Sequence, residues 1–276
     1  SCIYFSSFYS LIMPEIWLNY GKNEVVLDIM AENLDEQIKF EQPVIDDSMI
    51  NDNLEGLDLS KPTEIVIQNY TSSVQKILGK IYEKCDIKSF SKPKLLVDKR
   101  NLPQIKSNNP DTLSINEYEE QELSNSNLVF LGEVQFDGLF GYETVATRLL
   151  RKFGAEKMLE AFSHRSGDIP NPGKDSPPMN DAKKFTDEFE VSCIEITANK
   201  KGISGLQVGH PNKTSSISQT LLKSTATFEE KFRTMIISTG KDASNQTLSS
   251  SLTSVWNFYP SIKNQGLVIL IAECMG

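Results

Sequence analysis

The sequence predicts an α/β protein of two domains, each with a mostly parallel β-sheet and flanking helices, the second domain being truncated. Two observations lead to this fold class. Short runs rich in β-branched residues alternate with longer segments whose apolar residues recur at helical spacing. The order strand, helix, strand with short joints is that of a βαβ unit, whose stable form is a parallel sheet covered by helices.

The clearest βαβ unit lies in the N-terminal half. Residues 63–70 predict a compact strand, residues 73–85 a helix and residues 93–99 the next strand. Before this unit, the alternating run 24–29 predicts a further strand. The acidic region 31–61 is expected to be a solvated connection.

The centre of the chain continues the alternation of strands and helices. Residues 126–136 predict a strand, and residues 142–162 predict a helix pair that is broken at Gly154. The segment 166–178 is dense in glycine and proline, which predicts an irregular loop. Residues 179–189 then predict another helix.

The C-terminal part first reverses direction and then repeats the βαβ order. Residues 191–210 predict two strands around an Asn-Lys-Lys-Gly turn, so an antiparallel hairpin should join the sheet. Residues 218–232 predict a helix that leads to the second domain. There, strands at 233–240 and 266–274 flank the predicted helical segment 245–263.

These patterns suggest a division of the chain into domains. We expect residues 1–13 to be a non-native leader, because Met13 resembles a true start. Residues 14–215 should form the N-terminal domain, and residues 216–276 a linking helix with the start of an incomplete C-terminal domain. The apolar start is too short to cross a bilayer and has no basic region before it, which favours a cytoplasmic protein without membrane contact.

Composition narrows the class of partner. The net charge of −9 and the pI near 4.9 oppose binding to phosphate backbones, so we expect no nucleic-acid partner. A small molecule or a protein is favoured instead. The four cysteines are far apart and form no CxxC pair, which favours reduced thiols over a zinc site or a disulfide framework.

Common catalytic motifs are missing from the sequence. The segment "STGKDAS" lacks the first glycine of a P-loop, "DGLFGYET" has too few glycines for a dinucleotide fingerprint, and no GxSxG elbow is present. With only His164 and His210, a multi-histidine metal site cannot be built. Taken alone, His164 is expected to be a capping or surface residue and His210 a turn residue.

Several segments together resemble the nickel-pincer lactate racemase family. The strongest similarity is in the C-terminal "STGKDASNQTLSSSLTSVWNFYPSIKNQGLVILIAECMG", with its glycine turn, long helix and "ILIAEC" ending. The opening "EIWLNYGKNEVVLDIMAENL" and the central "LGEVQFDGLFGYETVATRLLRKFG" are similar to family segments in the same order. The similarity covers nearly all of residues 14–276. It implies an isomerase scaffold, a racemase or epimerase of 2-hydroxy carboxylates, with a nickel-pincer nucleotide as cofactor.

The resemblance also implies roles for residues near the central turn. A catalytic acid/base histidine of the family falls on Asp137. The lysine that anchors the cofactor falls on Thr147, with Arg148 beside it as a second cofactor-binding position. The nickel-ligating histidine falls on His164, where this sequence keeps the residue type.

Further positions come from other strand ends. The second acid/base histidine falls near Lys99, which is followed by Arg100 where the family also has an arginine. The substrate-binding arginine falls on Ser72. The helix that reaches the substrate falls on residues 249–253, without its lysine. Ser238 lies at the carboxyl end of a predicted strand, where ligands of such sheets bind, and is a substrate-binding candidate.

Three functional hypotheses remain open. The first is a diverged lactate-racemase-like protein that has lost the nickel-pincer reaction and is a pseudoenzyme or a binder of a small carboxylate. The second is an enzyme of the same scaffold acting on a 2-hydroxy acid with altered machinery, for which the candidates are Asp137, Lys99 or Arg100, His164 and Ser238. The third is a protein-interaction domain without ligand chemistry.

Overall fold

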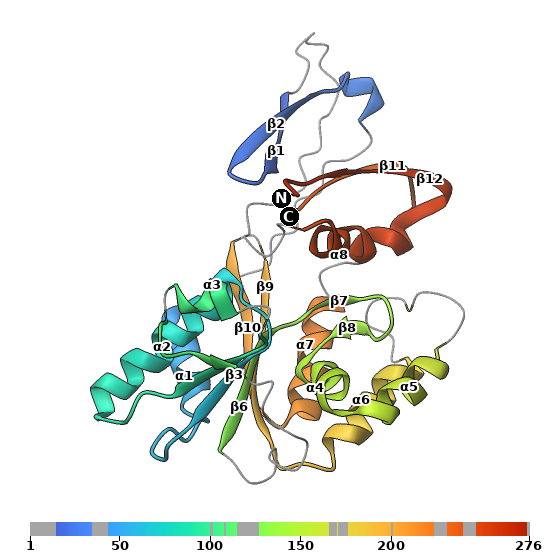
Figure 1. Ribbon diagram of the computed structural model, residues 1–276. Coiled ribbons are helices and arrows are strands. Elements are labelled where there is room, and N and C mark those ends of the chain that lie inside the picture. Colours follow the sequence, from blue (N-terminus) through green and yellow to red (C-terminus); the bar gives the residue numbers. More distant parts are fainter. Residues whose placement is uncertain are drawn as a thin grey trace. The chain divides into compact units, whose positions relative to one another are not determined.

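The computed structural model of the 276-residue chain describes residues 15–34, 44–99, 102–107, 109–114, 127–165, 170, 176–199, 201–223, 231–239 and 247–274 (Figure 1). The described residues fall into two compact units, which are treated separately. Residues 44–223 form the larger unit, and residues 15–34 together with 231–274 form the smaller one. The expected leader 1–13 lies outside the described residues.

This division differs from the sequence-based one at the N-terminus. The sequence analysis placed residues 14–215 in a single domain, whereas the described part of 15–34 belongs to the same unit as the C-terminal strands. The physical reason is a set of contacts between segments that are far apart in sequence. Ser238 Oγ donates a hydrogen bond to the Asn19 carbonyl oxygen over 2.7 Å, and the Lys22 amide donates to the Glu273 carboxylate over 3.3 Å.

The larger unit is built on a six-stranded sheet with the order β10-β9-β6-β3-β4-β5. All neighbouring pairs are parallel except β9 and β10, which form an antiparallel hairpin at one edge. Both features confirm the sequence analysis. The strands are β3 Glu64–Ile67, β4 Lys94–Val97, β5 Leu113–Ser114, β6 Leu128–Glu133, β9 Ser192–Asn199 and β10 Gly202–Gly209.

Helices cover both faces of this sheet (Figure 1). On one face, side chains such as Ile67 and Leu131 pack with residues of α1 and α2. On the other face, side chains such as Val66 and Phe130 pack with residues of α4, α5 and α6. Because successive side chains of a strand point to opposite faces, the sheet contributes to two hydrophobic cores, one on each face. The helices of this unit are α1 Asp47–Leu54, α2 Ser72–Lys88, α3 Leu102–Lys106, α4 Val145–Phe153, α5 Ala155–Ser163, α6 Pro177–Thr186 and α7 Pro211–Lys223.

A short hairpin, β7 Gln135–Asp137 and β8 Gly141–Glu143, stands between β6 and α4. Its aromatic residues Phe136, Phe140 and Tyr142 are buried or nearly so and anchor it. Phe140 and Tyr142 belong to the core under α4. Burial raises the pKa of Tyr142 to about 12. The hairpin thus lies where the sequence analysis expected only the end of one strand and the start of a helix.

The smaller unit contains an antiparallel hairpin, β1 Glu15–Tyr20 with β2 Asn23–Asp28, followed by the 3-10 turn η1 Ala31–Asn33. It also contains β11 Phe232–Ser238, α8 Leu248–Phe258, the 3-10 turn η5 Tyr259–Ser261 and β12 Ile262–Ile271. The strands β11 and β12 are parallel with α8 between them in sequence. This confirms the strand, helix, strand pattern expected for the C-terminal part.

Two sequence-based expectations on secondary structure were wrong, and one strand was missed. The acidic region 31–61 contains α1, which is capped by the Asp46 carboxylate accepting from the Met49 amide over 2.8 Å, and which buries Ile50 and Leu54 one turn apart. The strand β1 was missed because its alternation is short. The helix predicted at 218–232 begins instead at Pro211, a residue favoured at the first helical position.

Among the described residues, no helix is long and apolar enough to cross a membrane. Cys85, Cys193 and Cys274 are free thiols. Cys85 and Cys193 are buried, and burial raises the pKa of both, that of Cys193 well above its usual value.

Candidate functional site

The strands β3 and β6 are parallel neighbours whose chains leave in opposite directions. From β3 the chain passes through α2 to β4 on one side, and from β6 it passes through α4, α5 and α6 to β9 on the other side. The carboxyl ends of these two strands therefore form the switch point of the sheet, where ligands of open α/β proteins bind. This edge is the candidate site.

The two strand ends are joined by the side chain of Asn69. Its Nδ2 donates to the Glu133 carbonyl oxygen over 3.0 Å, and its Oδ1 accepts from the Glu133 amide over 2.9 Å. The Glu133 carboxylate in turn accepts from Thr71 Oγ1 over 2.6 Å, and Thr71 caps α2. A polar network therefore fixes the start of α2 against the end of β6.

The start of α4 is equally well fixed. The Thr144 and Thr147 side chains form a reciprocal capping box, in which the Thr144 amide donates to Thr147 Oγ1 over 2.9 Å. Thr147 is fully buried, and its hydroxyl also donates to the Thr144 carbonyl oxygen over 3.0 Å. Both hydrogen-bonding functions of the Thr147 hydroxyl are thus used within the helix end.

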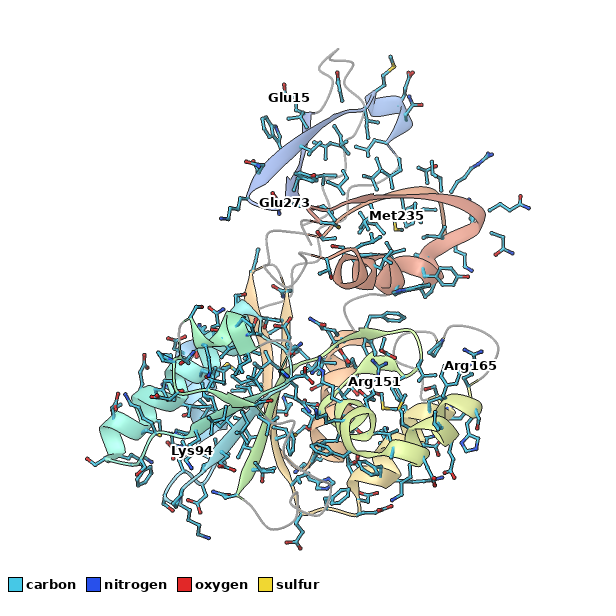
Figure 2. All side chains as sticks on the ribbon, viewed as in Figure 1. Glu15, Lys94, Arg151, Arg165, Met235 and Glu273 are labelled. Carbon is cyan, nitrogen blue, oxygen red and sulfur yellow. The ribbon has the colours of Figure 1, made fainter. Side chains whose placement is uncertain are left out.

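The β7–β8 hairpin is held on α4 by arginine side chains. The Asp137 carboxylate accepts from the Leu139 and Phe140 amides and from the Arg151 guanidinium. Arg151, labelled in Figure 2, also lies 3.5 Å from the Glu143 carboxylate. The hydrogen bonds of Asp137 therefore stabilise the β7–β8 hairpin and its contact with α4.

Arg148 lies at the centre of the site. Its Nη2 donates to the Glu133 carbonyl oxygen over 2.9 Å and to the Glu143 carboxylate over 3.2 Å. Its Nη1 is buried and has no hydrogen-bond partner among the residues that the structure describes. The side chain passes over Gly132, where an added Cβ would stand 2.5 Å from Nη1, so only glycine leaves the space that the guanidinium occupies.

A fully buried carboxyl group, that of Glu195 on β9, lies under the start of α4. Its Oε1 accepts from the Val145 amide over 2.7 Å and from Ser215 Oγ over 2.9 Å, and its Oε2 has no hydrogen-bond partner of normal geometry in the described part of the chain. Burial raises the pKa of Glu195, although the Val145 amide, the Ser215 and Ser218 hydroxyls and Arg148 act in the opposite direction.

The Glu143 carboxyl group behaves differently because it faces two cations. Burial acts to raise its pKa, but Arg148 and Arg151 outweigh this effect and lower it. The site thus contains one carboxylate that is held ionised by arginines and another, Glu195, whose ionised form is disfavoured.

The structure places the residues singled out from the sequence in several locations. It brings together Asp137, Thr147 and Arg148 around α4 and the β7–β8 hairpin. Ser72 is the exposed first residue of α2, directly after the cap residue Thr71 that contacts Glu133.

The remaining predicted residues lie elsewhere. Lys99 is exposed after β4, and Arg100 lies outside the described residues. Ser238 belongs to the smaller unit. His164 ends α5 with its side chain 55% exposed, and its Nδ1 lies 2.8 Å from the Asp181 carboxylate. The roles of all these residues stay predictions.

Sequence reasoning missed the polar residues Gln68, Asn69, Glu133 and Glu195. One signal was available for Glu195, which interrupts the apolar strand "CIEIT", because a charged residue at a buried position of a parallel strand calls for a partner. The other three follow or end apolar strands at the carboxyl edge.

The residues at the family positions do not fit a nickel-pincer nucleotide. Thr147, at the anchoring position, is buried and uses its hydroxyl in the capping box. His164 pairs with Asp181 at an exposed helix end, and no group of three or more histidine, cysteine or acidic residues in the described part of the chain is arranged to hold a metal ion.

Together, these features define the class: an α/β protein with the lactate racemase fold, in which polar side chains gather at the switch point between β3 and β6. Among solved structures, the chain is similar to the lactate racemase apoprotein from Thermoanaerobacterium thermosaccharolyticum. The TM-score is 0.64 at 13% sequence identity, and the match covers 93% of this chain and 74% of that chain. No protein-family description and no curated protein sequence matches the chain.

Proposed function

We propose that this protein binds a small 2-hydroxy carboxylate at the β3–β6 edge and does not carry out nickel-pincer racemisation. The observation that carries the proposal is the Arg148 guanidinium, which is only 9% exposed and has one nitrogen without an acceptor in the described chain. A buried guanidinium favours a carboxylate because its planar fork matches two carboxylate oxygens.

The present partner of Arg148 supports this assignment. Glu143 already places a carboxylate 3.2 Å from Nη2. The Glu143 side chain is 25% exposed, whereas Nη1 is buried, so an incoming carboxylate reaches the guanidinium from the Glu143 side. Binding is then an exchange of an internal carboxylate for that of the ligand.

Loss of the racemase reaction is supported by the groups that would have to perform it. Asp137 is engaged by two backbone amides and by Arg151, and Thr147 is engaged in the cap of α4. Neither residue supplies the amine that anchors the cofactor or an imidazole that transfers a proton at neutral pH.

Calorimetric titration of the full chain with each enantiomer of lactate tests the binding. We expect saturable binding that Arg148→Lys weakens about tenfold or more, because lysine keeps the charge but loses the fork. The matched control is Arg165→Lys, on an exposed arginine that stacks on the Phe162 ring. Equal affinities of wild type and Arg148→Lys would contradict the proposal.

A second variant guards against loss of folding as an explanation. Glu143→Gln removes the internal competitor and should tighten lactate binding about threefold to tenfold, a gain that a misfolded protein cannot imitate. Weaker binding by this variant would argue against carboxylate exchange.

The loss of the reaction is tested separately. The full chain is co-expressed with a system that makes the pincer nucleotide, and its nickel content and intact mass are measured. We expect neither stoichiometric nickel nor a covalent adduct. Nickel together with an adduct, and conversion of one lactate enantiomer to the other, would favour the enzyme hypothesis.

The alternative function, a protein-interaction domain without ligand chemistry, is favoured by one observation in the smaller unit. Trp17 and Val26 are direct cross-strand partners on the β1–β2 hairpin and are 58% and 42% exposed. Large apolar side chains paired on a strand surface are typical of contact with another surface. Lack of lactate binding at every pH would favour this alternative.

A further inference from the structure

Gly132, over which the Arg148 guanidinium lies, belongs to a row of residues that crosses the sheet and is otherwise polar. Gly132 on β6 is the ladder partner of Glu195 on β9, and Glu195 is the partner of Gln207 on β10. On the other side, Gln68 follows Ile67, which pairs with Leu131. Because ladder partners in a sheet point their side chains to the same face, these residues share the face covered by α4.

Three polar atoms of side chains near Gly132 lack hydrogen-bond partners in the described chain. They are one donor, Arg148 Nη1, and two acceptors, Gln68 Oε1 and Glu195 Oε2. Arg148 Nη1 and Gln68 Oε1 lie 2.5 and 3.1 Å from the point where a Gly132 Cβ would stand. Arg148 is also close enough to Glu195 for its charge to influence that carboxyl group. Buried polar atoms without partners are rare, and several together indicate a niche for a further group.

We propose that the binding of a carboxylate at Arg148 is coupled to the uptake of one proton by Glu195. The coupling rests on the proposed function and adds its regulation. In the free protein, the Arg148 guanidinium favours the ionised form of Glu195. A bound carboxylate takes the place of Glu143 on the guanidinium and brings its negative charge to the buried Nη1, beside Glu195, so the ionised form of Glu195 loses its support.

The proton comes from solvent and forms an O–H bond on Oε2, the oxygen without a hydrogen-bond partner of normal geometry among the described residues. Oε1 keeps its hydrogen bonds from the Val145 amide and the Ser215 hydroxyl. The protonated group then has a donor to offer, to the Ser218 hydroxyl or to the ligand, and the niche no longer holds two neighbouring carboxylates. By linkage, a ligand that raises the pKa of a group binds more tightly as the pH falls.

The other titratable groups around Glu195 are less well placed for this role. Arg148 on α4 and Glu143 on β8 form an ion pair, in which the ligand takes the place of Glu143. On β9 itself, the buried Cys193 thiol bonds with Thr214, and its pKa is already raised well above the usual value. On β6, Glu133 contacts Thr71 at the start of α2, which packs on the opposite face of the sheet.

The elements α7 and β10 offer polar but non-titratable groups to this carboxyl. They are Ser215 and Ser218 on α7 and Gln207 on β10. Glu195 is therefore the group best placed to take the proton.

The experiment is a calorimetric titration of the full chain with lactate in phosphate and in Tris, two buffers with different enthalpies of ionisation, at several pH values. The difference in observed enthalpy gives the number of protons taken up. We expect uptake to approach one proton per lactate in the pH range where Glu195 is ionised in the free wild-type protein and protonated in the complex, with affinity rising there by up to about tenfold for each pH unit of decrease. Glu195→Gln should still bind lactate, with uptake near zero and an affinity independent of pH.

Glu188→Gln is the matched control, because Glu188 is exposed and pairs with Lys157. It should keep the wild-type uptake. If Glu195→Gln fails to fold, infrared spectroscopy of the wild type decides, since lactate binding should produce the carbonyl band of a newly protonated carboxyl group. Binding without uptake, or uptake that persists in Glu195→Gln, overturns the coupling and leaves the proposed function intact. Absence of binding overturns both.

Discussion

The side chain of Asn69 and the backbone of Glu133 exchange two hydrogen bonds, so that a side-chain amide continues the ladder between β3 and β6 beyond the end of β3. The last backbone bond of this pair runs from the Gln68 amide to the Leu131 carbonyl oxygen. Asn69 therefore stands in for one more strand residue. It leaves the chain free to turn into α2 at the place where a ligand would bind.

Replacement of Asn69 by aspartate tests this relationship. Asn69→Asp keeps the acceptor for the Glu133 amide but places a carboxylate oxygen against the Glu133 carbonyl oxygen. We expect a loss of about 1–3 kcal/mol in the free energy of unfolding at pH 7, measured by urea denaturation. The loss should shrink at acidic pH, where a protonated carboxyl group can donate again. Asn180→Asp, on an exposed helix position, is the control and should change little.

Gly132→Ala should affect Arg148 more than the fold. The new Cβ would stand 2.5 Å from Nη1, at the end of a flexible side chain, so the guanidinium has to move. We expect a loss of about 1 kcal/mol in the free energy of unfolding and a drop in lactate affinity of about tenfold. Gly138→Ala offers a matched comparison, because nothing lies within 4 Å of its added Cβ. Unchanged affinity in Gly132→Ala would show that the position of the guanidinium does not matter for binding.

The Glu143 carboxylate predicts a dependence of stability on pH. Arg148 and Arg151 lower its pKa in the folded state against the effect of burial. A group with a lowered folded-state pKa stabilises the protein above its unfolded value, here 4.5, and this contribution is lost as the pH falls through the folded value. Urea denaturation between pH 7 and pH 3 should therefore show a smaller loss of stability in Glu143→Gln than in the wild type. Parallel curves for the two proteins would contradict this role.

His164→Gln tests whether the residue at the family's nickel-ligand position binds nickel in this protein. Its pair with Asp181 is exposed, so we expect the free energy of unfolding to change by less than about 1 kcal/mol. Nickel titration followed by calorimetry should give the same result for wild type and variant. A nickel affinity that falls in His164→Gln would restore the assignment of this histidine as a ligand.

Most of the larger sheet could be predicted from the sequence, because its strands are short β-branched runs separated by helices with clear periodicity. The run "EIVI" and the helix 72–88 are examples, and Gly154 marked the break between α4 and α5. The helix α1 was missed because its acidic composition hides two buried side chains, Ile50 and Leu54.

The candidate site was predicted less completely than the fold. The turn after β6 was identified, since glycines between a strand and a helix at the carboxyl edge mark such sites. The neighbours of Arg148 could not be found, because Gln68, Glu143 and Glu195 lie 80, 5 and 47 positions away along the chain and come close to it only through the sheet ladder and the β7–β8 hairpin. Pairings of this kind depend on tertiary structure, which sequence spacing does not reveal.

The capping box of Thr144 and Thr147 limits which side chains position 147 can hold. A change of Thr147 to lysine would remove the reciprocal cap and place an amine in a fully buried position. A lysine there would therefore require the start of α4 to be rebuilt, so a point mutation alone does not create an amine at this helix start.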